Sequence, residues 1–451
     1  MKDRVSRSIE EKKARYAQLC DLIWSKPERN FREFYAAGVL TQTLREAGFE
    51  IELGLAGMPS AFRATFGSGH PVVSFLAEYD ALAGLSQQAC CEERIPIIPN
   101  GDGHGCGHNS MGPCCAAAAI AMKEIMEQDA SPGTVVVYGC PAEETGGGKC
   151  FLAREGLFEG VDFAISPHPF PDAGFIGPTL ATAQVEYSFT GVASHASAMP
   201  DQGRSALDAA ELMVMGVQFL REHIIQEARL HHAYLNAGGT SPNVVQAEAS
   251  LLFYIRAPKA HQVMEIFQRV NRIANGAAMM TDTTVNIRHR SGLADMIPND
   301  VLGALLGESW AELGPCLYSD EARELAARMA PTVGRDPNAP ILDERVPAYD
   351  PNAPLMMGST DVGDVSYLVP AACLNFPGVV LGTPAHSWQW VSQAASPIMH
   401  DGLIHAAKIL ALTGMKLLAY PTLAEKAKAE LLQKTGGKVQ SMLPEGAVPE
   451  F

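Results

Sequence analysis

The chain has 451 residues, enough for two or three domains, and 47% of them are hydrophobic while 19% are charged. This composition is typical of a folded protein with a large apolar core, and it excludes a disordered or low-complexity chain. Thirty-four Lys and Arg against 50 Asp and Glu leave a net charge of −16, so we expect no nucleic-acid partner and no binding to a membrane.

The N-terminus and the cysteines both bear on the location of the protein. The N-terminal sequence MKDRVSRSIEEKKARYAQL is charged and lacks the apolar run of a secretory signal. No stretch reaches the roughly 18 to 20 uninterrupted apolar residues that span a bilayer. The adjacent pairs Cys90-Cys91 and Cys114-Cys115 do not have the spacing of a secreted disulfide framework. We therefore expect a cytoplasmic protein with reduced thiols.

The first 180 residues have the pattern of an α/β domain. Two helices are predicted in the first fifty residues, separated at Lys26-Pro27 and ended by Gly48. Short apolar runs then alternate with helical stretches, the runs at 71–77, 134–138 and 161–166 and the helices at 113–128 and 149–158. This alternation predicts a mostly parallel sheet covered by helices on both faces. Ligand sites in such sheets lie beyond the carboxyl ends of the strands.

A second unit interrupts this domain. Its predicted elements are a strand, a helix, a long strand or hairpin, a helix and a strand, at 183–190, 204–228, 243–257, 260–277 and 283–289. Such an order predicts a small two-layer α+β module, residues 181–297, inserted between residues 1–180 and 298–451 of the first domain. The chain then returns to an apolar run at 371–376 and a final helix at 397–418, and we expect the polar tail from Gly436 to be loosely held.

Four segments carry residues that commonly bind metals. Cys106 and His108 lie in the Gly-rich segment 101–109, whose glycines permit the backbone angles that turn both side chains toward one point. The adjacent carboxylates of Glu143 and Glu144 follow the apolar run 134–138, and a neighbouring pair suits one metal ligand and one general base. The other two segments each offer a histidine after an apolar run, namely His168 and His386.

Each segment alone is compatible with an ordinary polar loop, but together they indicate a catalytic metal site. Mixed Cys, His and Glu ligands suit a transition metal such as Zn or Mn better than Mg or Ca. The candidate ligands are dispersed from Cys106 to His386, whereas a structural zinc site is closed and local.

These segments resemble the M20 metallopeptidases, in the amidohydrolase branch whose signature is GHxCGH, here His104 to His108 with the preceding glycine. Segments 359–366 and 385–388 are most similar to the aminobenzoyl-glutamate hydrolase B-subunit group of that branch. The resemblance runs from about Pro27 to Leu418. It implies a three-layer, zinc-exopeptidase-like catalytic domain with an inserted lid and dimerisation domain.

The resemblance also implies a role for individual residues. One or two metal ions would be bound by Cys106, His108, Glu144, His168 and His386. Glu143 would be the general base and acid, and Asp80 the carboxylate that orients a metal-bound histidine. In the lid, His195 would enter the partner subunit's active site to stabilise the oxyanion, while Asn243 and Arg256 would reach the substrate.

Three positions depart from the family pattern: Asn109 stands where many relatives carry Asp, Glu78 where the peptidase branches put a ligating His, and Gly363 where many have Glu. These departures favour the amidohydrolase branch and leave the number of ions at one or two. Of the remaining conspicuous residues, we expect His231-His232 to end a lid helix, at the surface or in a dimer contact. Trp388 and Trp390 either line the substrate pocket or pack the sheet edge.

The expected enzyme is a metal-dependent amidohydrolase, a homodimer through its lid. It would cleave the C–N bond of a small-molecule substrate, an N-acyl or N-aroyl amino acid or a dipeptide. An alternative with the same site is an aminohydrolase that releases ammonia from an electron-poor aromatic amine such as a nitroanthranilate. A third is a non-catalytic, metal-binding partner subunit, against which the intact Glu143 and ligand set argue.

Overall fold

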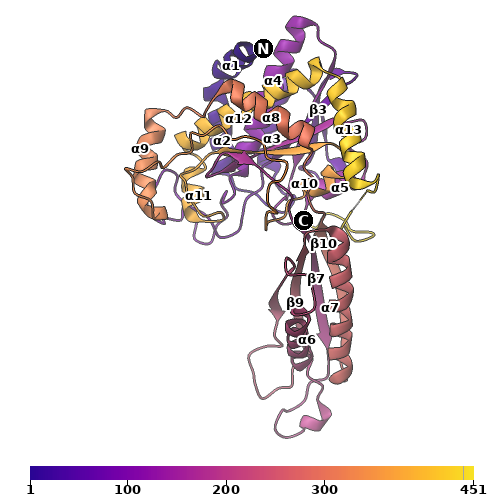
Figure 1. The fold of residues 1–451 in the computed structure, drawn as a ribbon. Helices are drawn as coiled ribbons and strands as arrows, with labels where there is room; N and C mark the ends of the chain where they lie inside the picture. The colour runs from indigo at the N-terminus through magenta and orange to yellow at the C-terminus, as the bar shows by residue number, and fades with distance from the viewer. Residues whose placement is uncertain (440) are drawn as a thin grey trace.

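The computed structural model describes residues 1–439 and 441–451, which form two bodies (Figure 1). The larger body is built on a seven-stranded sheet with the strand order β1-β2-β4-β3-β5-β11-β6. The smaller body projects from it and contains a four-stranded sheet with the order β10-β7-β9-β8, all from residues between Ala181 and Leu293. The ten cysteines are free thiols.

The centre of the large sheet is parallel, as predicted. Its four parallel strands are β4 (Gly133–Cys140), β3 (Val72–Glu78), β5 (Phe163–Phe170) and β11 (Ala371–Pro377). Antiparallel strands flank them on both sides, namely β1 (Glu50–Leu53), β2 (Phe62–Ser68) and β6 (Gly174–Phe175). The carboxyl ends of the four central strands therefore meet at one edge, where ligands are expected.

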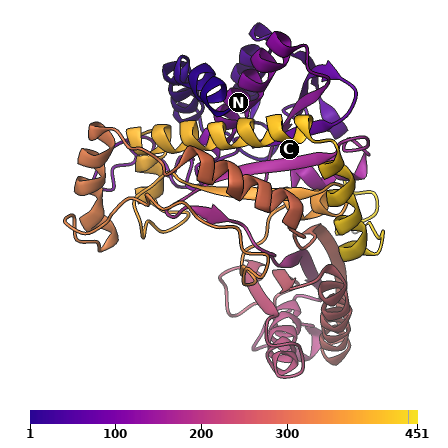
Figure 2. The same cartoon turned by 45° about the horizontal axis from the view of Figure 1, so that its top comes forward.

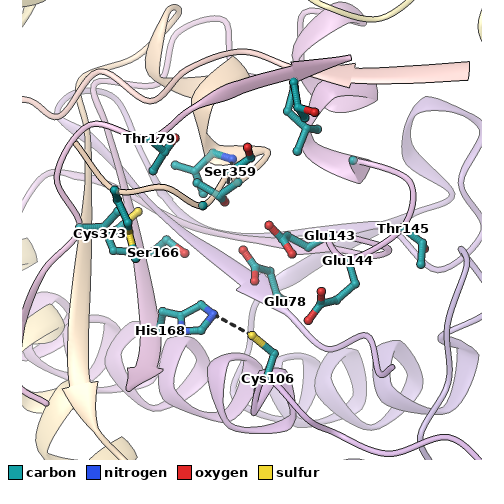
Figure 3. Close-up of a pocket in the computed structure, with 18 of the residues that line it drawn as sticks. Glu78, Cys106, Glu143, Glu144, Thr145, Ser166, His168, Thr179, Ser359 and Cys373 are labelled. Carbon is teal, nitrogen blue, oxygen red and sulfur yellow. Dashed lines mark hydrogen bonds between the residues drawn. The ribbon is translucent and has the colours of Figure 1, made fainter. Parts of the chain in front are cut away.

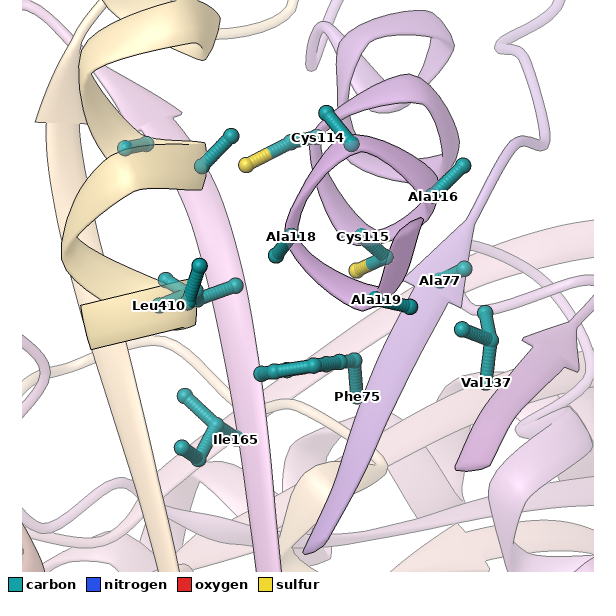
Figure 4. Packing of buried hydrophobic residues seen from close by; sticks show 14 of the residues in the cluster. Phe75, Ala77, Cys114, Cys115, Ala116, Ala118, Ala119, Val137, Ile165 and Leu410 are labelled. Atoms are coloured by element: carbon teal, nitrogen blue, oxygen red, sulfur yellow. The ribbon is translucent and has the colours of Figure 1, made fainter. Parts of the chain in front are cut away.

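Helices cover both faces of this sheet. Consecutive strand residues point to opposite sides, and in the central strands the residues of both sides are buried. Phe75 packs with α4 (Met111–Asp129) and α12 (Pro397–Ala419), as Figure 4 shows around Leu410, whereas Leu76 belongs to the cluster that includes α5 (Gly148–Arg154) and α10 (Val362–Ser366). The other helices of this body are α1 (Lys2–Glu10), α2 (Lys13–Ser25), α3 (Phe34–Glu46), α8 (Asp300–Leu313), α9 (Asp320–Met329), α11 (Trp388–Gln393) and α13 (Thr422–Thr435).

Helix α12 runs along the whole layer above the sheet (Figure 2). It is long and apolar enough by composition to cross a membrane, but 83% of its most apolar stretch is buried inside the protein. Its apolar character is therefore explained by the core that it shares with α4.

The small body is the predicted two-layer α+β module. Its four strands are antiparallel, β7 (Ala181–Thr190), β8 (Arg229–Asn236), β9 (Glu248–Ala257) and β10 (Thr284–Leu293). Alternate residues of β7, including Val185 and Tyr187, are buried against α6 (Ala206–Arg221) and α7 (Ala260–Met280). The residues between them on β7 remain partly exposed on the opposite face.

Several predicted elements were wrong in extent. The first fifty residues form three helices instead of two, and α13 follows the helix expected to be the last. The lid helix predicted at 204–228 ends at Arg221, and His231-His232 lie on strand β8 instead of ending that helix. The helix predicted at 149–158 ends at Arg154, two residues before Gly156, which adopts a φ of 72°. Proline-flanked His168 lies within β5, which continues to Phe170 because it pairs with β11.

The C-terminal tail packs against both bodies, although its sequence is polar. Gln440 lies outside the described residues, but Met442 is only 2% exposed and belongs to the lid core. The expectation of a loosely held tail is therefore wrong for residues 441–451, because Met442, Leu443 and Ala447 all pack on apolar clusters.

Candidate active site

A cavity of about 400 Å³ lies where the carboxyl ends of the central strands face the lid. Glu78 ends β3, Glu143 and Glu144 follow β4, and His168 belongs to β5. Figure 3 shows these side chains and Cys106 directed toward one space. This cavity thus lies at the sheet edge where the strand pattern predicts a ligand site.

Unusual backbone conformations bring the loops of this site together. Gly107 has a φ of 79°, and a Cβ at Gly103 would lie only 2.3 Å from the Leu85 carbonyl oxygen, so glycine is required there. Ala142, directly before the two glutamates, and His386 have positive φ values of 56° and 55°, which non-glycine residues rarely adopt. The His386 amide donates to the Gly105 carbonyl over 3.0 Å and joins two distant loops. Such strain is typical of functional sites.

Two groups of side chains that could hold a metal ion share Cys106. Cys106, His108 and His168 form one group and Cys106, Glu144 and His386 the other, and within each group the ligand atoms all lie within 4.8 Å of one another. Cys106 Sγ is 3.5 Å from His168 Nε2 (Figure 3). His386 Nε2 is 3.4 Å from Glu144 Oε1.

The unpartnered atoms of these groups fit a metal centre. His108 Nε2 and Glu144 Oε1 are buried and make no hydrogen bond of regular geometry within the described chain, although Glu78 Oε2 lies 3.3 Å from the first and His386 Nε2 3.4 Å from the second. A metal ion would satisfy both atoms. The donors are sulfur, imidazole nitrogen and carboxylate oxygen, a set suited to divalent transition metals.

Asp80 lies behind this site and connects two of its parts. Its carboxylate is 2.8 Å from His108 Nδ1 and accepts the Glu144 backbone amide over 2.9 Å. The contact with Nδ1 directs Nε2 of His108 toward the cavity. His168 is oriented in the same way, because its Nδ1 lies 2.7 Å from the Pro169 carbonyl oxygen.

The charges of the site act strongly on one another because it is buried. Burial and the Glu144 carboxylate oppose ionisation of the Cys106 thiol, but His168 and His108 outweigh them and lower its pKa to about 6. Burial, followed by the carboxylates of Glu78 and Asp361, raises the pKa of Glu143. In general the thiolate is the form of cysteine that binds metals, and a carboxylate with a raised pKa holds a proton well.

A buried ion triad, which the sequence did not predict, includes the cavity residue Glu78. Lys149 is completely buried, and its Nζ lies 2.6 Å from both Glu78 Oε1 and Asp361 Oδ1. The Lys149 amide also donates to Asp361 over 2.9 Å. The other oxygen of Glu78, Oε2, lies 3.3 Å from His108 Nε2. In the sequence, Glu78 stands out only as a departure from the family pattern, and Lys149 only as a cation among small and apolar residues.

The lid contributes polar side chains to the opposite wall of the cavity. Arg256 on β9 lies 3.5 Å from Ser359 Oγ and 5.6 Å from the centre of the Tyr254 ring, and its buried Nε has no hydrogen-bond partner among the described residues. Apolar side chains complete the lining, namely Phe170, Ile176, Leu293, Met356 and Cys373. The cavity therefore has a cationic end and an apolar wall.

Two predicted lid residues do not reach this cavity. His195 and Asn243 lie in neighbouring loops, where the Ala196 amide donates to the Asn243 carbonyl over 3.0 Å. The start of β7 lines the cavity, and His195 follows the end of this ten-residue strand. A strand of that length spans roughly 30 Å, which separates His195 from the cavity of its own chain.

The two tryptophans beside His386 pack against apolar clusters and do not line the cavity. Trp390 is 2% exposed in the main core, and Trp388 contacts the cluster around α9. Of the two interpretations left open, packing is therefore the one observed.

Known proteins share this chain's sequence pattern and fold. The sequence model of peptidase family M20/M25/M40 matches residues 75–387. The B-subunit of the p-aminobenzoyl-glutamate hydrolase of Escherichia coli K12 is 42% identical, over 95% of this chain and 94% of the relative. The Xaa-Arg dipeptidase of Mus musculus is 31% identical, over 95% of this chain and 92% of the relative.

Solved structures show the same fold at low identity. A dinuclear metal-binding peptidase of the M20 family from Bacillus subtilis superimposes with a TM-score of 0.61 at 17% identity, over 91% of this chain and 99% of that one. An aminobenzoyl-glutamate utilization protein from Klebsiella pneumoniae gives a TM-score of 0.55 at 17% identity, over 88% of this chain and 98% of that one. Family model, relatives and fold agree: the chain belongs to peptidase family M20/M25/M40 and is a metal-dependent amidohydrolase.

Proposed function

We propose that this chain hydrolyses the amide bond of an N-acyl or N-aroyl amino acid, or of a dipeptide, in the cavity between its two bodies. The observation that carries the proposal is the pair of ligand groups sharing Cys106, with the carboxylate of Glu143 lining the same cavity. A dispersed ligand set with an additional carboxylate suits hydrolytic chemistry, since structural metal sites are closed and local.

Two ions fit the ligand set. One would be held by Cys106, His108 and His168, and the other by Cys106, Glu144 and His386. The sulfur and imidazole donors favour Zn or Mn over Mg or Ca. When bound, such ions polarise a carbonyl group and lower the pKa of a water molecule.

Glu143 would carry the proton in this reaction. Its pKa is raised by burial and by the neighbouring carboxylates, so it accepts a proton from the attacking water more readily than an exposed glutamate does. It would then return this proton to the departing nitrogen. Asp80 would keep the His108 ring in the orientation that ligation requires.

The lining of the cavity supports an amino-acid conjugate as the substrate. The guanidinium of Arg256 is suited to a carboxylate, which the amino-acid part of such a substrate offers. The apolar wall that includes Ile176 and Met356 is suited to the acyl or aroyl part. The E. coli relative is named for a substrate of this kind, p-aminobenzoyl-glutamate.

A partner subunit would complete the site through the lid. His195 would stabilise the oxyanion in the partner's cavity, and Asn243, which lies beside it, would contact the partner's substrate. The edge strand β8 exposes Tyr234 and Leu235, and these offer a surface for a second copy of the chain. A related but different chain is the alternative partner, since two of the E. coli relatives are named as different subunits of one hydrolase.

The test is turnover in oxygen-18 water by protein loaded with Mn or Zn. The panel holds N-aroyl and N-acyl amino acids, dipeptides and electron-poor aromatic amines, with product detection by mass spectrometry. Label in a new carboxylate supports the proposal. Label in a ring hydroxyl, with release of ammonia, establishes the aminohydrolase instead. If metal-loaded protein turns over no compound of the panel while a matched preparation of the E. coli relative is active, the amide proposal fails.

A further inference from the structure

The last described residues, Ser441–Phe451, cross the junction between the two bodies. We call this segment the C-terminal strap. Figure 1 places its end at the top of β10, where the lid meets the large body. The strap touches both bodies, and its contacts fall into two sets.

The first set binds the strap to the lid. Met442 is 2% exposed within the lid core, and Gly292 of β10 permits this approach, because a Cβ there would lie 2.7 Å from the Met442 carbonyl oxygen. Near its end, Glu450 pairs with Arg288 and lies 3.9 Å from Arg290 Nη2. Both arginines belong to β10, so the strap holds this strand at two places.

The second set binds the strap to the large body. Leu443 and Ala447 pack on the cluster that includes Phe151 of α5, and Arg154 donates to the Ala447 carbonyl over 2.7 Å. The ring of Phe451 lies 6.1 Å from that of Phe31 in an edge-to-face arrangement. Contacts with the lid and with the large body therefore alternate along eleven consecutive residues.

The strap also lies directly behind the candidate active site. Val448 and Glu450 line a cavity of about 190 Å³. Four other residues of its lining also line the active-site cavity, two from the loop after Glu144 and two from the lid strands β7 and β10, namely Thr145, Gly146, Gln184 and Ser291. A change in the strap thus reaches residues of the substrate cavity through one shared wall.

We propose that the C-terminal strap is a positioning segment that sets the orientation of lid strand β10 relative to the large body, and through it the width of the substrate cavity. Arg288 and Arg290 are the lid side of this connection, and Glu450 is its partner on the strap. The lid orientation itself does not depend on which bond is cleaved. The effect on substrate binding rests on the proposed amide hydrolysis.

The test is a charge reversal at the exposed ion pairs, which avoids the buried Met442. Glu450→Arg should increase amide hydrogen exchange in residues 441–451 and in the last residues of β10. Arg288→Glu combined with Glu450→Arg should restore protection in part, because the new arginine pairs with position 288 but still lies beside Arg290. Glu445→Arg is the matched control, because Glu445 lies on the same strap, is exposed, and has no ion pair within the described chain. The exchange readout requires no substrate, so it stands even where the proposed function fails.

Kinetics provide the second measurement. Glu450→Arg should raise KM about three- to fivefold, the range that surface ion pairs allow, with kcat and the thermal midpoint nearly unchanged. The wild-type KM should rise more steeply with salt between roughly 0.05 and 0.5 M than the KM of Glu450→Arg, which keeps only the salt dependence of the substrate's own contact with Arg256. The proposal is overturned if Glu450→Arg and Glu445→Arg have the same exchange pattern, or if the paired reversal restores neither protection nor KM.

Discussion

At the scale of single residues, the proposed general base is Glu143, which lines the cavity and forms a further group of possible metal ligands with Glu78 and His108. We expect Glu143→Gln to retain the metal and to reduce kcat at least about 100-fold, since the amide cannot accept a proton. Metal content by plasma mass spectrometry and single-turnover rates check this together. Turnover close to that of the wild type, in protein with the full metal content, would exclude Glu143 as the general base.

The buried triad around Lys149 leads to a prediction about stability. Lys149→Met leaves Glu78 and Asp361 as two buried carboxylates without their cation, so we expect the free energy of unfolding to fall by about 3 to 5 kcal/mol. Urea unfolding measures this change. The matched control is Lys12→Met, because the Lys12–Glu124 pair is about one-third exposed and should contribute less than about 1 kcal/mol.

A triple variant separates charge balance from packing. Lys149→Met with Glu78→Gln and Asp361→Asn removes the uncompensated charges and should recover most of the lost stability. If the triple variant is as unstable as Lys149→Met alone, the loss comes from packing, and the interpretation of the triad as a charge balance is wrong.

The candidate site shows which residue-level features a sequence can reveal. Cys106, Glu144 and His386 are of metal-binding type and follow predicted strands or glycine-rich turns, so topology alone indicates that they converge. The triad has no such signal. Glu78 and Asp361 are distant in the sequence. Only the folded chain brings both carboxylates to within 2.6 Å of Lys149 Nζ.

At the scale of elements, burial explains why the sequence predicts one lid strand and misses another. Strand β7 alternates clearly because one of its faces packs on α6 and α7. Strand β8 is the edge of the sheet and only Leu230 among its residues is buried, so it has no alternating apolar pattern. Strand β5 continues through Pro167 and Pro169, although proline has no N–H to donate. This is possible because β3 pairs with β5 only up to Ile165, so the side of β5 that faces β3 makes no strand hydrogen bonds beyond that residue.

The junction of α10 with the end of β10 leads to a prediction about pH. Asp364 of α10 accepts the Ala294 amide over 2.8 Å, and burial raises its pKa to about 7. Because this pKa is higher in the folded than in the unfolded state, the folded protein loses stability as pH rises from about 4 through 7. Asp364→Asn keeps an oxygen acceptor but does not ionise. The difference in the free energy of unfolding, Asp364→Asn minus wild type, should therefore increase by roughly 2 to 3 kcal/mol between about pH 5 and pH 8.

Urea unfolding of both proteins at several pH values measures this gain. Asp162→Asn is the control of opposite sign, because burial opposes ionisation of Asp162 but Lys428 and His70 outweigh it and lower its pKa. Parallel stability curves for Asp364→Asn and the wild type would show that Asp364 does not titrate in this range.

At the scale of the whole molecule, the projecting lid places two of its predicted functional residues at opposite ends of strand β7. Arg256 reaches the cavity of its own chain, whereas His195 lies beyond the far end of β7. The resemblance found in the sequence predicts the lid and a His195 that acts in the partner's cavity, but no pattern of residues places His195 far from the cavity of its own chain. The length of β7 supports the proposed shared site, because it separates His195 from the cavity of its own chain.

Subunit mixing tests this shared site directly. His195→Ala and Glu143→Gln should each be nearly inactive as homodimers, because every cavity lacks either the oxyanion donor or the general base. In a mixed dimer, one cavity receives Glu143 from one chain and His195 from the other and is therefore complete. Random exchange makes half of the dimers mixed, with one complete cavity of two, so activity should recover to about a quarter of the wild-type value. Native mass spectrometry confirms that mixed dimers form, and mixed dimers without activity would place His195 outside the reaction.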